Sequence, residues 1–497
     1  MVKINISRQN LSTITNAKLK TYDEIPGPKG YPIVGNLFSI KELGGEFTTN
    51  RFDKFVQELY NQYGELVKWS ILGHKQIFIY NPDHAKLVFQ VEGQIPIRPV
   101  VIPWQIYSKR KNYPPGLINS QGEEWKKQRS ASNPIVARPK SVVTYLDTHN
   151  KITNEFIQIL NNNFKTKQDN SFIVDKFQNE LKFLTLEMMS VVAFDHRLEC
   201  INPNKRQQVI DDLITNIEKY SILTSKLFYS FPLWRLYRNS VWVEFEQVSD
   251  FIFDFTRKYV EESFKLMKEQ NNNQNQTMLQ QYIKNQDKIN LKLEELVSVM
   301  SEFLLGAFDT SSTTLHFLFQ LLGTNLDIQE EIYQEIISVY PNNDYIDEDI
   351  LSKIPLLKAS IKESKRIFST SPTVGRITSV DLVINNYLIP KNTLVNIGYE
   401  IIGNLEKYFK DAKKFNPKRW LKENQQSEPI HPYSSLPFGF GARMCIGRRL
   451  AEQKMYLIII KLLKNYKIEY IGDKELKSSF RLITVPQFDL KLKFTKR

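Results

Sequence analysis

The chain has 497 residues, of which 41% are hydrophobic and 24% charged, which is the composition of an ordinary globular protein and not of a disordered or membrane-embedded one. Its two cysteines, Cys200 and Cys445, exclude a disulfide framework and a cysteine-rich zinc module. The formal net charge is +13, and no stretch reaches the ~18 consecutive apolar residues that a transmembrane helix requires.

The N-terminal segment, residues 1–25, is predicted to be a polar, basic tail. It holds Lys3, Arg8 and two further lysines, several Ser and Thr, and no acidic residue before position 23. This composition is typical of a disordered tail. Mitochondrial presequences are also basic and rich in serine, but they carry more arginine than this segment does. Pro26–Gly30 then predicts a rigid, extended lead-in, because closely spaced prolines fix the backbone and remove its donors.

Short elements and an irregular stretch follow the lead-in. The apolar residues from Phe52 to Tyr60 recur with helical spacing, and the β-rich runs Leu66–Leu72 and Gln76–Tyr80 predict a hairpin. Val91–Gly116 contains five prolines and is predicted to be irregular. A structureless stretch of that length in a compact domain is usually functional.

From Gly122 to Ser338 the pattern is predominantly helical, with a solvated loop expected over the Asn/Gln-rich run Gln270–Gln276. No internal repeat and no shift in composition divides the chain. The sequence therefore predicts a mainly α fold with small β-sheets, as a single large domain over residues 26–497. The expected elements are a long helix at Leu291–Gly323, a helix at Asp349–Ser369, β-like runs in Arg376–Tyr387, an irregular region at Gly403–Ser435 and a helix at Arg448–Asn465.

A glycine-rich loop precedes the last of these helices and carries one of the two cysteines. It runs Phe438-Gly439-Phe440-Gly441-Ala442-Arg443-Met444-Cys445-Ile446-Gly447. Glycines permit positive φ and a close approach of backbone to a ligand, and a cysteine at a helix N-terminus beside an arginine is favoured as a thiolate. Cys445 is therefore a candidate metal ligand. The alternative for either cysteine is a small buried hydrophobic side chain, and Cys200 has no setting that suggests more.

The spacing F-G-x-G-x-R-x-C-x-G resembles the haem-binding loop of the cytochrome P-450 family at every fixed position. The resemblance implies a haem b cofactor whose iron is ligated by Cys445, with Arg443 paired to a haem propionate. It also implies that Phe438, Gly439 and Gly447 contact the haem. A proximal thiolate of this kind pushes electron density toward the iron and favours O–O cleavage. The implied fold is that of the family, a single large domain around a buried haem.

Two further segments match that family in the same order along the chain. Glu363 and Arg366 stand three residues apart on one helix face, and Arg419 follows Pro417 downstream. In the family the corresponding residues form a buried Glu–Arg–Arg network near the haem. Lys418 stands where an acidic residue is usual, at a position outside that network. The alternative, an exposed i,i+3 ion pair, would be worth little.

The long helix contains Gly306-Ala307-Phe308-Asp309-Thr310-Ser311, which resembles the family's oxygen-activating segment. A carboxyl next to a hydroxyl can relay protons, so the resemblance implies that Asp309 and Thr310 carry the two protons that dioxygen activation needs. Ala307 departs from the more usual glycine, which predicts a tighter groove. A Thr310 hydroxyl bonded back to its own helix is the structural alternative, and both roles can hold together.

Three residues elsewhere resemble the family's propionate partners. Trp125 and Arg129 lie four apart on a predicted helix face, and Arg376 follows Pro372 and Gly375. Two anionic propionates require buried cations, and arginine suits them because it stays charged and binds carboxylates bidentately. Ordinary surface ion pairs are the alternative for each of these residues.

The resemblance covers about residues 25–497 and implies a haem-dependent monooxygenase. Such an enzyme inserts one oxygen atom from O2 into an apolar organic substrate, with electrons from a separate NADPH-dependent flavoprotein reductase. The substrate pocket is expected to be lined by residues near 91–116, Phe308, Thr370–Val374 and the chain near Ile483–Pro486. An acidic reductase is expected to dock on basic residues, namely Lys126, Lys127, Arg129, Arg448, Arg449 and Lys454.

Other functions stay open on the sequence alone. A haem-thiolate isomerase or dehydratase needs no electrons, but such enzymes typically lack the acid–alcohol pair at Asp309 and Thr310. A haem sensor would consume no oxygen, and a nucleic-acid-binding protein would need a clustered basic patch that the dispersed charge does not supply. We expect the positive charge to serve a reductase and a peripheral membrane contact. With no anchor visible before the lead-in, we expect the endoplasmic reticulum membrane or the cytoplasm ahead of mitochondria.

Overall fold

A computed structural model of the chain describes residues 19–32, 34–36, 38–39, 52–71, 73–163, 170–230, 232–269, 277–285, 291–341, 345–472 and 477–497. Most of the predicted tail (residues 1–18) and the predicted loop Gln270–Gln276 lie outside the described residues. In the part of the chain that is described, no helix combines the length and the apolar character needed to cross a membrane.

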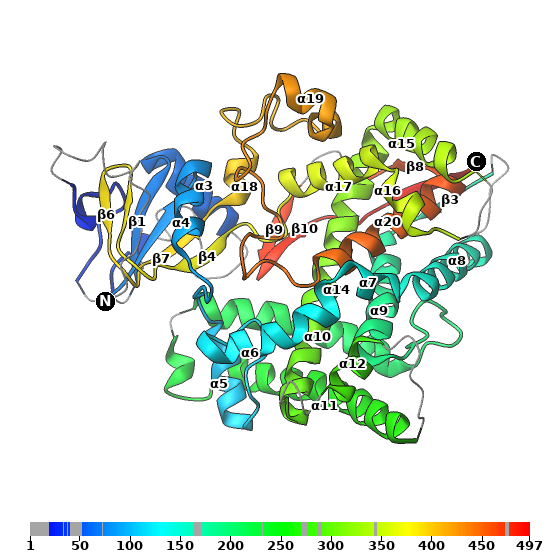
Figure 1. Cartoon of the computed structure of the whole chain (residues 1–497), viewed down its shortest axis with the longest axis horizontal. Coiled ribbons are helices and arrows are strands. Elements are labelled where there is room, and N and C mark those ends of the chain that lie inside the picture. Colours follow the sequence, from blue (N-terminus) through cyan, green and yellow to red (C-terminus); the bar gives the residue numbers. More distant parts are fainter. Residues whose placement is uncertain are drawn as a thin grey trace.

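A long helix, α14 (Leu293–Thr324), passes through the centre of the molecule (Figure 1). Its side chains are apolar on almost every side, and most of them are buried, as expected of a helix surrounded by protein. Glu294 and Glu295 in the first turn complement the helix dipole, and a carboxylate oxygen of Glu295 accepts the backbone N–H of Lys292 at 2.8 Å. The predicted helix at Leu291–Gly323 is therefore confirmed, with small shifts at both ends.

The molecule is mainly α, which confirms the predicted fold class, and several of the other helices pack against α14 (Figure 1). Single turns of helix also occur at Tyr22–Glu24, Asn133–Ala137, Pro232–Arg235 and Pro417–Trp420. The described helices besides α14 are α3 (Phe52–Tyr63), α4 (Pro82–Val91), α5 (Ile102–Lys111), α6 (Gly122–Ser132), α7 (Pro139–Val143), α8 (Leu146–Asn163), α9 (Phe177–Phe194), α10 (Gln208–Tyr229), α11 (Ser240–Glu269), α12 (Met278–Lys284), α15 (Leu326–Val339), α16 (Glu348–Ser352), α17 (Pro355–Ile367), α18 (Tyr399–Gly403), α19 (Lys422–Ser427) and α20 (Arg448–Asn465).

The strands form four small sheets. The largest has the order β1-β2-β7-β4, in which β2 and β7 are parallel and the other two pairs antiparallel. The others have the orders β3-β11-β8, β10-β9 and β5-β6. The predicted hairpin is confirmed as β1 and β2. The strands are β1 (Leu66–Ile71), β2 (His74–Ile79), β3 (Ser171–Val174), β4 (Val374–Ile377), β5 (Leu382–Ile384), β6 (Tyr387–Ile389), β7 (Leu394–Ile397), β8 (Tyr466–Tyr470), β9 (Ser478–Arg481), β10 (Ile483–Pro486) and β11 (Leu492–Lys496).

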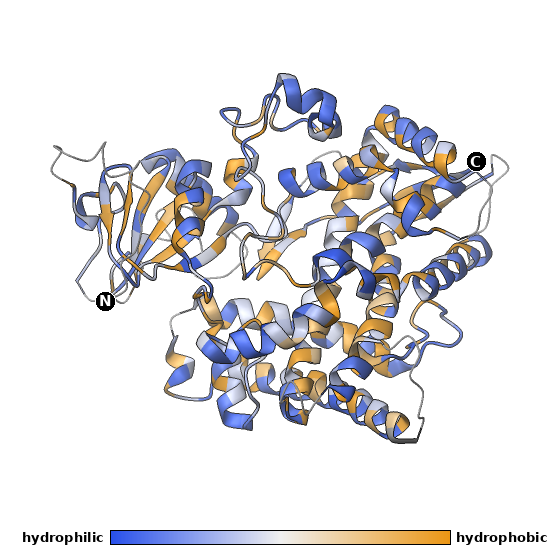
Figure 2. Cartoon of the chain, viewed as in Figure 1, coloured by the Kyte–Doolittle hydropathy of each residue, from blue (hydrophilic) through white to orange (hydrophobic). Residues whose placement is uncertain are grey.

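Two hydrophobic cores hold these elements together. The larger core joins the helices around α14 with the β3-β11-β8 sheet, and the smaller core fills the β-rich end with α3, α4 and strands β1, β2 and β7. Figure 2 shows hydrophobic residues concentrated on the strands of the β-rich end and on the inner helices, and hydrophilic residues along α19 and the outer helices. This burial of apolar surface is the main stabilising contribution to the fold.

Three sequence predictions of secondary structure were wrong. The region Gly403–Ser435 is not irregular throughout, because it contains a single turn at Pro417–Trp420 and α19. Val91–Gly116 is not irregular throughout, because α5 forms within it. Pro103 lies in the first turn of α5, where a missing N–H costs nothing, and Asn112 ends the helix in the left-handed conformation (φ 57°). The predicted helix at Asp349–Ser369 is divided into α16 and α17, since Pro355 can begin a helix but cannot continue one.

Candidate functional site

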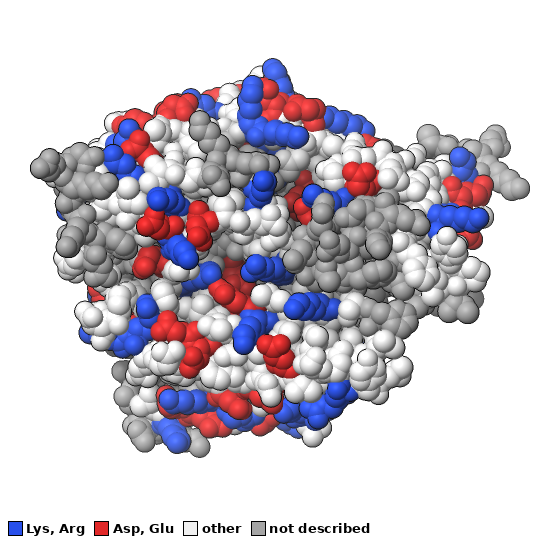
Figure 3. All heavy atoms as spheres, turned by 180° about the vertical axis from the view of Figure 1, so that it is seen from behind, with Lys and Arg blue, Asp and Glu red and all other residues white. Residues whose placement is uncertain are grey.

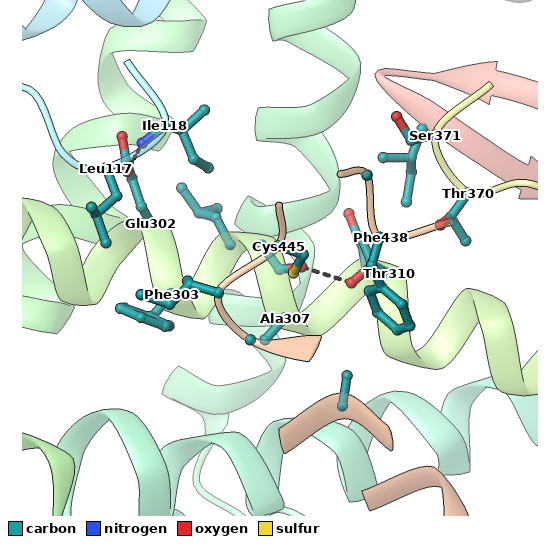
Figure 4. Close-up of a pocket in the computed structure, with 18 of the residues that line it drawn as sticks. Leu117, Ile118, Glu302, Phe303, Ala307, Thr310, Thr370, Ser371, Phe438 and Cys445 are labelled. Atoms are coloured by element: carbon teal, nitrogen blue, oxygen red, sulfur yellow. Dashed lines mark hydrogen bonds between the residues drawn. The ribbon is translucent and has the colours of Figure 1, made fainter. Parts of the chain in front are cut away.

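A cavity of about 450 Å³ lies between α14 and the glycine-rich loop that precedes α20. Figure 4 shows Cys445 of that loop together with Ala307 and Thr310 of α14, with Glu302 toward one end and Thr370 and Ser371 toward the other. The rest of the lining is mainly apolar, and it includes Val101, Trp104, Leu117, Phe303, Val374 and Ile483.

The loop holds Cys445 with its sulfur toward this cavity. Gly439 and Gly441 both have φ of +72°, a conformation that favours glycine, and the Cys445 N–H donates to the Phe438 carbonyl at 2.8 Å. Gly447 ends the loop at the N-terminus of α20, and a Cβ there would meet no protein atom within 4 Å. Cys200 lies buried in the larger core, so Cys445 is the one cysteine with accessible surface, and that surface faces the cavity.

Opposing effects act on the Cys445 thiol. Burial raises its pKa, while the Gly447 N–H and the cations Arg129, Lys365 and Arg98 lower it. The position at a helix N-terminus therefore does not by itself produce a thiolate, contrary to the simplest sequence expectation. Coordination to a metal ion would supply the missing stabilisation, because a coordinating thiol is deprotonated outright.

Four arginines converge on the same cavity, namely Arg98, Arg129, Arg376 and Arg443. In the described part of the chain, Glu92 is the only carboxylate ion-paired with any of them, at 2.6 Å from Arg376. Burial first, and then repulsion from the other arginines, lowers the pKa of Arg443 to about 9. Burial and the neighbouring Arg376 likewise lower the pKa of Arg98 to about 10. A wall with this excess of positive charge is suited to an anionic ligand.

Arg443 and Arg376 donate from every guanidinium nitrogen to protein oxygens, whereas Arg129 does not. Arg443 donates to the carbonyls of Pro96 and Ser120 at 3.0 and 2.9 Å, and its guanidinium lies 3.9 Å from the centre of the Trp125 ring. Arg129 donates to the Met444 carbonyl at 2.9 Å, but its Nε is buried without a hydrogen-bond partner. The four residues that the sequence proposed as propionate partners, Trp125, Arg129, Arg376 and Arg443, are thus brought together.

Glu363, Arg366 and Arg419 form a separate cluster in which one carboxylate is ion-paired with both guanidinium groups. Glu363 accepts from Arg366 at 2.8 and 2.9 Å and from Arg419 at 3.0 Å. It also accepts the Trp420 indole N–H at 2.8 Å and the Asn416 backbone N–H at 3.1 Å. Glu363 and Arg366 are buried, and Arg366 and Arg419 also donate to backbone carbonyls. The three sequence-predicted residues therefore meet, at the C-terminal half of α17.

Asp309 and Thr310 lie on the α14 wall of the cavity. The Ser221 hydroxyl of α10 donates to Asp309 at 3.0 Å, and burial raises the pKa of Asp309 to about 6. The Thr310 hydroxyl donates to the Gly306 carbonyl one turn earlier at 2.7 Å (Figure 4). This is the intrahelical bond that the sequence analysis named as the alternative role of Thr310. It occupies the hydroxyl hydrogen and leaves the oxygen able to accept a bond.

Sequence reasoning missed Glu302, which faces the cavity two turns before Thr310. It accepts the Ile118 backbone N–H at 2.7 Å, and burial raises its pKa to about 8. It also missed Arg98. Glu302 could have been found from its spacing, because Glu302, Gly306 and Thr310 lie four residues apart on one helix face. Arg98 gives no such signal, since it lies between Pro96 and Pro99 in a stretch without periodicity.

Two expected site residues lie elsewhere. Phe308 does not line the cavity but is fully buried in the larger core, because it falls on the helix face opposite to Gly306 and Thr310. Lys454 is not on a docking surface, because it is 1% exposed and lines the cavity near Met189. Arg129 is also turned toward the cavity, so neither residue can serve a surface contact.

Comparison with known proteins decides the family. A model of the family described as "Cytochrome P450" matches residues 25–494. The chain belongs to the cytochrome P-450 family. A mitochondrial cholesterol side-chain cleavage enzyme of Hypanus americanus is 30% identical over 88% of this chain and 84% of its own length. A probable mitochondrial cytochrome P-450 of Drosophila melanogaster is 29% identical over 96% of this chain and 87% of its own length.

Members of the cytochrome P-450 family are haem-dependent monooxygenases that hold haem b through a cysteine thiolate, and this chain is accordingly an oxidoreductase of that type. The residues around the cavity fit such a group. They offer one accessible thiol, an excess of buried cations for two propionates, an unsatisfied Arg129 Nε and a glycine, Gly447, that leaves open space beside the sulfur. When bound, a thiolate-ligated haem supplies the electron density that favours O–O cleavage.

Proposed function

We propose that this chain oxygenates an apolar organic substrate inside the cavity, with Cys445 as the axial haem ligand. The observation that carries the proposal is the juxtaposition in one cavity of the Cys445 sulfur and four arginines that are short of carboxylate partners. Arg98, Arg129, Arg376 and Arg443 would bind the haem propionates, with Trp125 packed under Arg443. Phe438, Gly439 and Gly447 would contact the haem on the Cys445 side.

Asp309 and Thr310 would supply protons on the opposite side. A carboxyl whose pKa is about 6 exchanges protons readily near neutral pH, and Ser221 holds it in place. The Thr310 oxygen can accept a bond while its hydrogen remains on the Gly306 carbonyl. Asp309→Asn and Thr310→Ala should therefore each lower product formation per electron consumed, without changing haem binding. Unchanged product yield in both variants would contradict this role.

The substrate would be mainly hydrophobic. The apolar side chains of Trp104, Leu117, Phe303, Val374 and Ile483 line the cavity. Burial keeps the Glu302 carboxyl largely neutral at pH 7, since its pKa is about 8. Spin-state shifts of the haem during titration with lipid-like and terpenoid compounds would identify ligands, and small charged metabolites should give none.

The electron donor would dock on an exposed basic surface formed by Lys362, Arg448 and Arg449. Lys362 and Arg448 are close enough to repel each other, and Arg448 also lies 5.7 Å from the Phe438 ring centre beside the Cys445 loop. Elsewhere the charge is dispersed, and the face seen in Figure 3 shows Lys and Arg interspersed with Asp and Glu. A positive docking surface steers an acidic donor protein toward the haem side of the loop.

Two classes of electron-donor protein could dock on this surface. The family resemblance predicts an NADPH-dependent flavoprotein reductase, whereas the mitochondrial names of two relatives support a ferredoxin-type iron–sulfur protein. We favour the ferredoxin-type donor. Arg449→Glu should slow donor-driven turnover about tenfold and spare peroxide-driven turnover. The exposed Lys151, paired with Asp147, provides the matched control Lys151→Glu. Equal losses in both assays, or faster reduction by the flavoprotein, would overturn this assignment.

A mitochondrial location is the proposal that the relatives support, in place of the sequence expectation of endoplasmic reticulum or cytoplasm. A peripheral membrane contact would use the apolar turn between α10 and α11. There Leu233, Leu236 and Tyr237 are 43%, 85% and 57% exposed beside Arg235. Leu236→Asp should abolish co-flotation with anionic vesicles, and protease protection of the full-length protein in isolated mitochondria would test the location.

The monooxygenase activity is tested by reconstitution with each donor, NADPH and candidate hydrophobic ligands. Oxygen consumption that tracks formation of a hydroxylated product is expected. Oxygen-independent rearrangement of a ligand would instead indicate an isomerase, and ligand binding without either reaction would indicate a sensor.

A further inference from the structure

A buried lysine lies beside the Cys445 loop. Lys365 is on α17 between two members of the Glu363 cluster, but it lines the cavity instead of joining that cluster. It is 6% exposed, and its Nζ is 3.7 Å from the centre of the Phe438 ring. Phe438 itself begins the loop and accepts the Cys445 N–H through its carbonyl. The Lys365 ammonium is thus held over the aromatic ring at the base of the haem-ligand loop.

No carboxylate in the described part of the chain is paired with this ammonium. Among the described residues, Lys365 takes part in no ion pair, and its Nζ donates no hydrogen bond to a protein atom. The charged groups that face it are Glu452, Cys445 and Arg448, and Glu452 is already paired with Arg448 at 3.1 Å. Burial lowers the pKa of Lys365 to about 7, while Glu452 and Cys445 favour its charged form.

Packing alone does not require an ammonium at this position. A buried charge without a partner costs free energy, and the face of the Phe438 ring offsets only part of that cost. An unbranched apolar side chain such as methionine would fill the same space without the cost. The charge must therefore serve something other than the stability of α17, and the group beside it whose charge matters is the Cys445 sulfur.

We propose that Lys365 raises the reduction potential of the haem iron and so favours its reduction by the donor protein. This inference rests on the proposed ligation of the haem by Cys445. Ferric iron gains one electron, which the donor loses, and the iron–thiolate unit becomes more negative by one charge. A cation in a surrounding of low dielectric stabilises the reduced form more than the oxidised form. Lys365 forms no bond and transfers no proton in this step, so it is a positioning charge and not a catalytic residue.

The molecule provides a matched control in Lys454. This lysine is also buried, lines the same cavity and is paired with no described carboxylate, but its Nζ lies 3.9 Å from the Met189 sulfur. Its pKa is lowered to about 8 by burial alone, whereas that of Lys365 also responds to the charge of Cys445. Removing either charge relieves a similar burial cost, but only Lys365 should act on the thiolate.

The test is a spectroelectrochemical titration of the holoenzyme and its variants. Lys365→Met should lower the equilibrium constant for one-electron reduction about tenfold, which corresponds to 59 mV. Lys365→Gln should behave alike, Lys365→Arg should stay within about threefold of the wild type, and Lys454→Met should change the constant less than about twofold. Lys365→Met should also raise the thermal midpoint, since it removes a buried charge.

Three outcomes would overturn the role of Lys365. They are an unchanged potential in both Lys365→Met and Lys365→Gln, an equal shift in Lys454→Met, or a charge-retaining Lys365→Arg that behaves like Lys365→Met. The carbon monoxide complex of each reduced sample separates this result from the proposed function. A thiolate-type Soret band with an unchanged potential contradicts only the Lys365 inference, whereas absence of that band in the wild type contradicts the ligation by Cys445.

Discussion

The molecule buries arginine side chains in two neighbouring regions and balances their charge in opposite ways. At the C-terminal half of α17, the Glu363 carboxylate accepts five hydrogen bonds, three of them from Arg366 and Arg419. Around the cavity, only Arg376 is ion-paired with a described carboxylate, that of Glu92, and Arg98, Arg129 and Arg443 are not.

The difference separates a cluster that supports the fold from one that is completed by a ligand. Buried charges are tolerated when their partners lie within the protein, and the Glu363 cluster meets that condition. The cavity cluster does not, and mutual repulsion contributes to the low pKa values of Arg98 and Arg443. Two propionates would lower its excess of positive charge. Charge balance therefore identifies the cofactor wall independently of the Cys445 motif.

The largest expected effect on stability comes from breaking the Glu363 cluster. Glu363→Ala leaves two buried guanidinium groups without their carboxylate and should lower the free energy of unfolding by about 3–5 kcal/mol. Urea denaturation followed by circular dichroism measures it. Glu331→Ala, which removes an exposed partner of Lys418 (2.8 Å), should cost less than about 1 kcal/mol. Similar costs for the two variants would contradict a structural role for the Glu363 cluster.

A second effect is the pH dependence of stability that the buried Asp309 carboxyl produces. The pKa of Asp309 rises from 3.8 to about 6 on folding, so between these values the folded state binds a proton that the unfolded state has lost. Its contribution to stability is therefore present below pH 3.8 and is lost as the pH rises to about 6. Asp309→Asn should flatten the dependence of unfolding free energy on pH across this window, by up to about 1.4 kcal/mol per pH unit. Parallel pH profiles for the wild type and the variant would contradict the raised pKa.

A third, smaller effect is the loss of haem affinity expected when one of the four cavity arginines is removed. Arg98→Gln should weaken haem binding about 10- to 100-fold, because a charge-assisted hydrogen bond is worth about 1.5–3 kcal/mol. The unfolding free energy of the haem-free protein should not fall, since repulsion among the arginines is relieved. Haem transfer to apomyoglobin measures the affinity, and Lys151→Gln is the surface control. Lower stability of the Arg98→Gln variant with unchanged haem affinity would mean that Arg98 supports the fold and does not bind haem.

Local sequence signals predicted the elements on which the site is built. The glycine-rich loop that ends at Gly447 predicted the start of α20. Apolar periodicity predicted α14, and the β-rich runs predicted the β1–β2 hairpin. The prediction failed at α5, where proline density suggested an irregular segment although Pro103 occupies a tolerated first-turn position. Such a proline is distinguishable from a helix breaker only once the rest of the helix is known.

The site residues also separate into those that a local motif predicts and those that only the packing shows. Motif spacing predicted Cys445 and the Glu363 cluster, because these residues lie in short segments with a recognisable pattern. Arg98 and Lys365 carry no comparable signal, and Glu302 carries only its helical spacing, since the importance of all three comes from burial beside residues distant in the chain. A lone charged residue usually indicates solvent exposure, and only packing shows that these three are exceptions.

The spectrum of the reduced carbon monoxide complex tests the central claim most directly. The wild-type holoenzyme should show a Soret band at the long wavelength of a thiolate-ligated haem, and Cys445→Ser should lose it, whereas Cys200→Ser should keep it because Cys200 lies in the core. A band that survives Cys445→Ser unchanged, or that is lost only in Cys200→Ser, would contradict the account.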